Sequence, residues 1–140
     1  MKMKILDLLT PKRITGNYGE KQAAKYLRRH GYKILARNYV AAGAEIDLVA
    51  RTRDTTVFVE VKTRREGHEN PCEPRPASAV TPEKQRKIIS AARAFMRRER
   101  AVSRLRFDIA EVILYDEKKP KVKEIRHLIS AFSLDTAYQR

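Results

Sequence analysis

The sequence has one cysteine, three scattered histidines and no long apolar run, and each of these features excludes a class of protein. A single cysteine, Cys72, excludes an intrachain disulfide, which agrees with a reducing cytoplasm. The three histidines, His30, His68 and His127, are scattered and lack the spacing of a metal site. No apolar run is long enough to span a membrane, and the N-terminal run, interrupted by Asp7, is too short for a signal peptide. We therefore expect a cytoplasmic protein that does not contact a membrane.

Acidic residues are outnumbered by basic ones, 17 against 31, which gives the 140-residue chain a formal net charge of +14. So large an excess favours an anionic partner, most simply nucleic acid, although a basic protein without a specific polyanion partner is the alternative. No zinc finger, recognition-helix motif or aromatic stacking platform is present, so recognition of nucleic-acid shape or of a junction is expected rather than sequence reading. The length predicts one domain, with a core over about residues 16–130 and loose termini.

Hydrophobic periodicity predicts an α/β fold, a mixed β-sheet flanked by helices in the order α-β-β-β-α-β-β. The expected helices run from Asn17 to about Gly31 and from Thr81 to about Arg100. The expected strands cover residues 32–40, 44–51, 56–63, 105–114 and 122–129, the last at a sheet edge. Residues 64–79 lack periodicity and are rich in proline, which predicts a long loop.

Four charged residues lie where two neighbouring buried strands would present them together. Glu45 and Asp47 share one face of their strand, and Glu60 and Lys62 share one face of the next. The short Arg53-Asp54 connection predicts an antiparallel hairpin, which makes the two strands neighbours. Charges in such strands are costly unless they are paired or bound to metal.

These residue types are the ones that phosphodiester hydrolysis requires. Mg²⁺ (or Mn²⁺) takes oxygen ligands, which Asp47, Glu60 and the backbone carbonyl of Val61 would supply. Lys62 would orient or deprotonate the attacking water and offset phosphate charge. The alternative is that Glu60 and Lys62 form an ordinary solvated pair on a strand.

Other candidate residues lie on the two helices and after the Glu60 strand. Glu20 falls on the apolar stripe of the first helix and would point toward the sheet, unless it only forms a capping box with Asn17. The second helix has a basic face, which would contact phosphates or would simply be solvated. The groups expected nearest the scissile backbone are Arg64, Arg65, Lys84 and Lys87.

Three segments resemble a family of small bacterial proteins, the YraN-like family of the restriction-endonuclease-like superfamily. They are residues 18–27, beginning Tyr-Gly-Glu; residues 45–50, Glu-Ile-Asp-Leu-Val-Ala; and residues 57–64, Val-Phe-Val-Glu-Val-Lys-Thr-Arg. Ala79-Val80-Thr81 with Lys84, and Arg106-Phe107-Asp108, extend the match.

The resemblance implies the restriction-endonuclease-like core, which is shared with Holliday-junction resolvases. It aligns Asp47, Glu60 and Lys62 with the acid-acid-x-lysine motif and Glu20 with an acid that assists at the metal or water. Glu45 also matches a family position, where we expect a supporting role rather than metal ligation. Ala44 stands where the family usually has glycine, which puts the geometry of the preceding turn in question.

The leading hypothesis is a metal-dependent endonuclease that acts on DNA, with branched or junction DNA as a candidate substrate. The alternative is a nucleic-acid-binding protein whose nuclease site is weak or inactive, and a third, weaker interpretation is an RNA-associated basic protein. Cutting both strands of a duplex or junction uses two sites, which is a reason to consider a homodimer.

Overall fold

The computed structural model of the chain describes residues 11–67 and 80–134. Their elements follow the order α2 (Pro11–Arg29), β1 (Lys33–Ala41), β2 (Ala44–Thr52), β3 (Thr55–Arg65), α3 (Pro82–Arg98), β4 (Arg104–Leu114) and β5 (Val122–Phe132). The strands form one sheet in the order β1-β2-β3-β4-β5, parallel between β3 and β4 and antiparallel elsewhere. The α/β class, the order of elements and the place of β5 at the sheet edge are as predicted. No helix in the described part of the chain is both long and apolar enough to cross a membrane.

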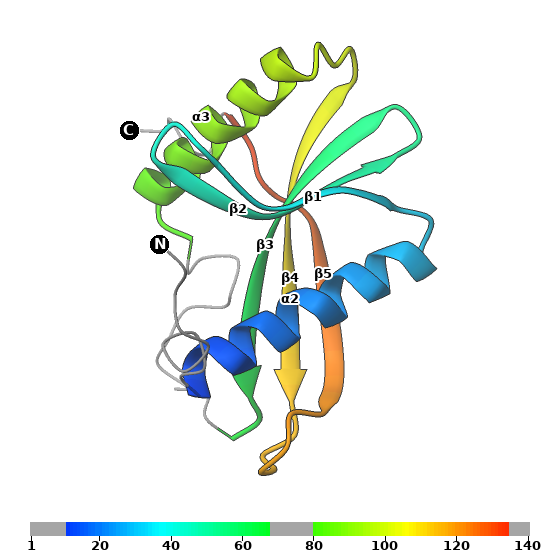
Figure 1. Cartoon of the computed structure of the whole chain (residues 1–140), viewed down its shortest axis with the longest axis vertical. Helices are drawn as coiled ribbons and strands as arrows, with labels where there is room; N and C mark the ends of the chain where they lie inside the picture. The colour runs from blue at the N-terminus through cyan, green and yellow to red at the C-terminus, as the bar shows by residue number, and fades with distance from the viewer. Residues whose placement is uncertain (1–10, 68–79, 135–140) are drawn as a thin grey trace, which may run out of the picture.

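The two helices pack on opposite faces of the sheet, so the core has two halves. Ala23, Ala24 and Leu27 of α2 are buried against Leu48 and residues of β3 and β4. On the other face, α3 contributes a cluster that includes Phe95, buried against Phe58 and Phe107. Figure 1 shows α2 crossing one face of β3, β4 and β5, with α3 beside the outer part of β2. Each half of the core therefore contains the side chains that point to one face of the sheet.

The first helix starts earlier than the sequence predicted. We expected Asn17 to cap the helix and Glu20 to complete a capping box, but α2 already begins at Pro11, so both residues lie inside the helix. Proline is favoured at the first helical position, because its missing N–H needs no partner there. The interpretation of Glu20 as only a capping residue is therefore wrong.

The predicted loop also begins later than expected. Arg64 and Arg65 extend β3 and pair with Ile113 and Leu114 of β4. Residues 68–79, which make up most of that predicted loop, lie outside the described residues, as do the terminal segments 1–10 and 135–140. The second helix starts as predicted, because Thr81 accepts a hydrogen bond from the backbone N–H of Lys84 and Pro82 follows at the first helical position.

The buried carboxylate of Asp108 in β4 contacts residues of the edge strand β5. Asp108 is fully buried; it accepts two hydrogen bonds from Arg106, of 2.9 and 2.8 Å, and one from the backbone N–H of Ser130. Nε2 of His127 lies 2.7 Å from the same carboxylate, and Arg106 also donates to the hydroxyl of Tyr32. Burial alone would raise the pKa of Asp108, but these hydrogen bonds outweigh it and lower the pKa.

Candidate active site

The sheet forks at the predicted site. The ladder between β2 and β3 ends at the pair Leu48 and Val59. Beyond this point β2 continues along β1, whereas β3 continues along β4. Figure 1 shows the pair β1 and β2 turning away from the direction of β3, β4 and β5. Asp47 and Glu60 are the first residues past the last ladder pair, one on each side of the fork.

The backbone of β2 twists sharply at Asp47. Ile46 belongs to the core half under α3, whereas Leu48, only two residues later, belongs to the half under α2. In a flat strand these two side chains would share a face. The twist therefore turns the side chain of Asp47 into the opening of the fork.

A hydrogen bond to Asp47 joins β2 and β3 at the fork. Oδ2 of Asp47 accepts a 2.7 Å hydrogen bond from the backbone N–H of Val61, a donor that the β2–β3 ladder has stopped pairing. This contact satisfies a backbone donor and fixes the carboxylate against β3. Because Glu60 precedes Val61 in β3, this hydrogen bond also places Asp47 beside Glu60.

Three carboxylates influence one another at the fork. Burial is the largest cause that raises the pKa of Asp47, and the negative charges of Glu60 and Glu20 raise it further. The Val61 hydrogen bond and the positive charge of Lys84 oppose this, yet the pKa of Asp47 still rises to about 8. A bound cation would favour the ionised form of Asp47 and so offset this rise in its pKa.

Glu60 is the most buried of these acids, with 7% of its surface exposed. Its Oε1 accepts a 2.6 Å hydrogen bond from Nζ of Lys84 on α3, and Nζ of Lys62 lies 3.7 Å from the same oxygen. The sequence placed Lys62 here, whereas Lys84 was expected at the substrate backbone. The structure thus brings both lysines to one carboxylate.

Glu20 and Glu45 are held by a residue that the sequence did not single out. Nδ2 of Asn38 in β1 lies 3.1 Å from Oε2 of Glu20 and 2.9 Å from Oε1 of Glu45. Asn38 has a positive φ of 50°, a conformation in which asparagine is enriched, but the sequence alone does not show this φ. The Asn38 contact agrees with a supporting role for Glu45 and keeps Glu20 on the side of α2 that faces the fork.

The substitution of alanine for glycine at position 44 leaves the turn before β2 intact. The residues with positive φ in this turn are Ala42 and Gly43, at 51° and 73°, which suits a two-residue hairpin turn. Ala44 already belongs to β2 and pairs with Ala41.

The remaining basic candidates differ in their surroundings. Arg64 forms an ion pair with Glu111 of β4, a buried carboxylate that the sequence analysis did not single out. Lys87 is exposed and lies 3.7 Å from Glu83, one turn away on α3. Arg65 is half-buried at the end of β3. Lys84 contacts an acid at the fork, Glu60.

The chemistry of these donors fits a hard divalent cation that keeps part of its water shell. Mg²⁺ binds through one or two carboxylates, with waters and substrate oxygens completing its shell. Asp47 and Glu60 supply two such carboxylates at one place. Within residues 11–67 and 80–134, no three side chains from histidine, cysteine, aspartate and glutamate converge into a complete metal cage. A site of this kind would depend on water and substrate for its other ligands.

The fold and the arrangement at the fork define a class: an α/β protein with the restriction-endonuclease-like core, in which strand acids meet at a break in a mixed sheet. Within this class, the chain belongs to the uncharacterised protein family UPF0102, whose family model matches residues 19–112.

Several relatives match over most of their length. A UPF0102 protein of Geobacter metallireducens is 43% identical, over 85% of this chain and 92% of the relative. One from Pelobacter propionicus is 42% identical, over 87% and 84% of the two chains, and one from Caldicellulosiruptor saccharolyticus is 39% identical, over 86% and 98%. These likenesses support the resemblance on which the site residues were aligned.

Proposed function

We propose that this protein is a metal-dependent endonuclease that hydrolyses phosphodiester bonds of DNA, with branched or junction DNA as a candidate substrate. The observation that carries the proposal is the contact across the fork. Asp47 is fixed on the amide of Val61, next to Glu60, and the pKa of Asp47 is raised to about 8. A half-buried acid with a raised pKa beside a buried acid is typical of a functional site.

The residues at the fork would have different roles in this reaction. Asp47 and Glu60 would hold Mg²⁺ (or Mn²⁺), with the backbone carbonyl of Val61 as a further candidate ligand and Glu20 assisting from α2. When bound, the ion would neutralise charge on the phosphate and lower the pKa of water. Lys62, whose Nζ lies 3.7 Å from Oε1 of Glu60, would orient the attacking water as an ammonium group, and it would take the proton of that water only as a neutral amine.

The basic residues near the fork would hold the substrate backbone. Lys84 and Lys87 come from the first turns of α3, and Arg64 and Arg65 follow Lys62 along β3. The four lie on two elements that meet at Glu60. Contacts of this kind are sequence-independent and weaken with salt.

One observation favours the second candidate, a nucleic-acid-binding protein with a weak or inactive nuclease site. Two lysines already lie near a single oxygen of Glu60, at 2.6 and 3.7 Å, and they offset its charge without a cation. Together with the net charge of +14, this arrangement is compatible with binding alone.

Cleavage of a DNA panel distinguishes the two candidates. Duplex, single-stranded and four-way-junction DNA are incubated with Mg²⁺ or Mn²⁺, with RNA as a competitor. We expect the wild type to cut at least one of these DNAs, and Asp47→Asn and Lys62→Met to lose roughly 10²-fold or more in rate while still binding DNA. Asp54→Asn is the matched control, because Asp54 is an exposed acid in the β2–β3 turn.

Binding without cleavage contradicts the enzyme proposal. If every DNA is bound with a steep salt dependence and none is cut with either metal, the protein is a binding module. Preferential binding of the RNA competitor would point to an RNA-associated protein instead.

A further inference from the structure

Lys84 is fixed at the start of α3 by its own helix cap. Its backbone N–H donates to Oγ1 of Thr81 at 3.2 Å, and Pro82 sets the first turn. The backbone of Lys84 therefore has little freedom, and its position relative to β3 is set by the packing of α3. From this place its side chain reaches Oε1 of Glu60 at 2.6 Å.

Lys84 and a divalent cation would compete for the same carboxylate. Lys84 lies more than 1 Å closer to Oε1 of Glu60 than Lys62 does (2.6 against 3.7 Å), so its ammonium is the main counter-charge of this nearly buried acid. A cation bound to Glu60 would be repelled by an ammonium group at that distance. Either Lys84 moves away from Glu60 when the ion binds, or its ammonium group weakens the binding of the ion.

The surroundings of Lys84 allow its side chain to move. Its side chain is 44% exposed, and it lines a hollow of about 420 Å³ between the β1–β2 turn and the first turns of α3. The same hollow is lined by Thr81, Lys87 and the two acids Glu45 and Glu83. A lysine that leaves Glu60 can extend along this hollow, where a second anion could receive it.

We propose that Lys84 is a positioning residue that couples metal loading to nucleic acid, an inference that rests on the proposed function. Without nucleic acid, Lys84 neutralises Glu60 and keeps divalent cations weakly bound. A backbone phosphate offers the ammonium another anionic partner, so Lys84 releases Glu60 and the ion binds more tightly. By linkage, the metal must strengthen nucleic-acid binding by the same factor.

Mn²⁺ affinity, measured without any cleavage assay, tests this proposal. Free Mn²⁺ is followed by electron paramagnetic resonance during titration of the wild type, Lys84→Met, Lys84→Arg and Asp47→Asn. We expect Lys84→Met to bind Mn²⁺ roughly 5–150-fold more tightly than the wild type, the usual range of such couplings. Lys84→Arg keeps the positive charge and should stay close to the wild type. Lys33→Met, which removes an exposed lysine at the far end of β1, is the control.

The same titration is repeated with short duplex DNA, and the signal of Asp47→Asn with DNA is subtracted to remove ions bound by the DNA itself. We expect DNA to tighten Mn²⁺ binding to the wild type and to do so much less in Lys84→Met. Thermal unfolding of each variant checks that the proteins are folded.

Two results would overturn the proposal, and they can be told apart. If Mn²⁺ binding depends on Asp47 but Lys84→Met binds no more tightly than the wild type, the coupling is absent while the proposed function stands. If none of the variants shows Mn²⁺ binding that depends on Asp47, both the coupling and the proposed metal-dependent function fail.

Discussion

At Asp47, opposing influences act on one carboxylate. Burial and the charges of Glu60 and Glu20 favour the protonated acid, whereas the amide of Val61 and the charge of Lys84 favour the ionised form. The balance lies with the protonated acid, and the pKa rises from 3.8 to about 8. Between roughly pH 4 and pH 8, the folded protein therefore holds a proton that the unfolded chain has released.

This difference predicts how Asp47 changes stability with pH. Because the folded state binds more protons in that window, the contribution of Asp47 to the free energy of unfolding falls as pH rises. We expect Asp47→Asn to gain stability relative to the wild type between pH 5 and pH 8.5, by roughly 1–5 kcal/mol, since each pKa unit is worth about 1.4 kcal/mol. Urea unfolding in EDTA at the two pH values measures the gain. A difference between the two proteins that stays constant with pH would contradict the raised pKa.

The sequence predicted the residues of β2 and β3 at the site, but not their partners from elsewhere in the chain. Strand alternation and a two-residue turn were enough to bring Asp47, Glu60 and Lys62 into one neighbourhood. The contact of Lys84 with Glu60 joins residues 24 positions apart and depends on how α3 packs. The bridging role of Asn38 depends likewise on the approach of α2 to β1. Such tertiary contacts leave no periodic signal.

At the level of elements, α2 approaches β3 so closely that a side chain at one position of α2 would force its neighbour to shift. A Cβ atom added to Gly19 would overlap Oγ1 of Thr63 and would lie 2.9 Å from its Cβ. Gly19 is buried and lies one residue before Glu20. The missing side chain thus allows α2 to carry Glu20 toward the fork.

We expect Gly19→Ala to destabilise the protein by about 1–3 kcal/mol, the usual cost of overpacking. Gly16→Ala is the matched control in the same helix, because a Cβ there meets nothing within 4 Å. It should stabilise by roughly 0.5–1 kcal/mol through helix propensity. Thermal or urea unfolding measures both.

The pair with Thr63 provides a further check. Thr63→Ala removes the hydroxyl that the new methyl group would overlap, so the double variant should lose less stability than the sum of the two single variants. Equal effects of alanine at positions 16 and 19 would show that the close approach of α2 to β3 does not exist.

The earlier start of α2 shows where local signals compete. Asn17 followed by Glu20 resembles a capping box, and the glycines at positions 16 and 19 weaken a helix in this stretch. Pro11 was the better signal for the first helical position. The close contact of Gly19 with β3 shows that tertiary packing, rather than propensity, explains Gly19 in this helix.

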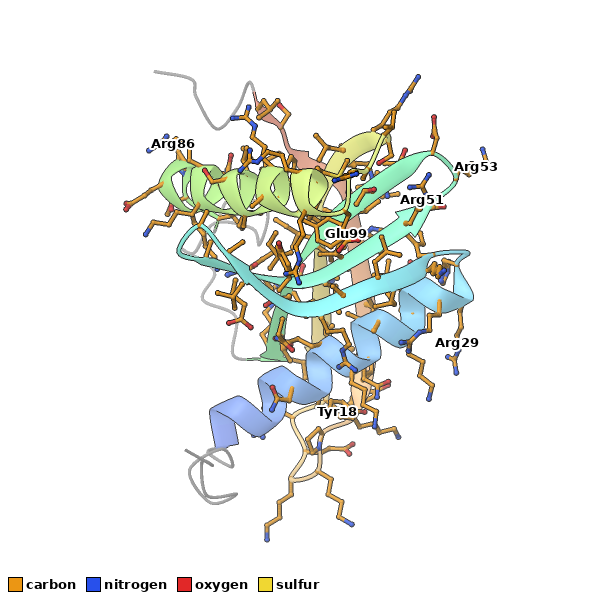
Figure 2. All side chains as sticks on the ribbon, turned by 45° about the horizontal axis from the view of Figure 1, so that its top comes forward. Tyr18, Arg29, Arg51, Arg53, Arg86 and Glu99 are labelled. Carbon is orange, nitrogen blue, oxygen red and sulfur yellow. The ribbon has the colours of Figure 1, made fainter. Side chains whose placement is uncertain are left out.

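Across the whole molecule, positive charge is spread over several surfaces. Figure 2 shows Arg29 at the end of α2, Arg53 at the β2–β3 turn and Arg86 on α3, well separated from one another. The net charge was evident from composition, whereas its distribution depends on the fold. Long-range attraction of a polyanion fits this spread, and the choice of where a substrate is cut would come from the fork.

The fork itself is assembled from four elements. Glu20 comes from α2, Asp47 from β2, Glu60 and Lys62 from β3, and Lys84 from α3. None of these elements could present the site alone. The proposed function requires that the fold bring these acids together on one cation, and locating the bound ion tests this requirement.

The most direct measurement is anomalous diffraction from crystals soaked in Mn²⁺. We expect an anomalous peak at the fork, about 2.0–2.4 Å from a carboxylate oxygen of both Asp47 and Glu60, and no such peak in crystals of Asp47→Asn. Crystals with Mn²⁺ bound elsewhere and no peak between these two side chains would contradict it.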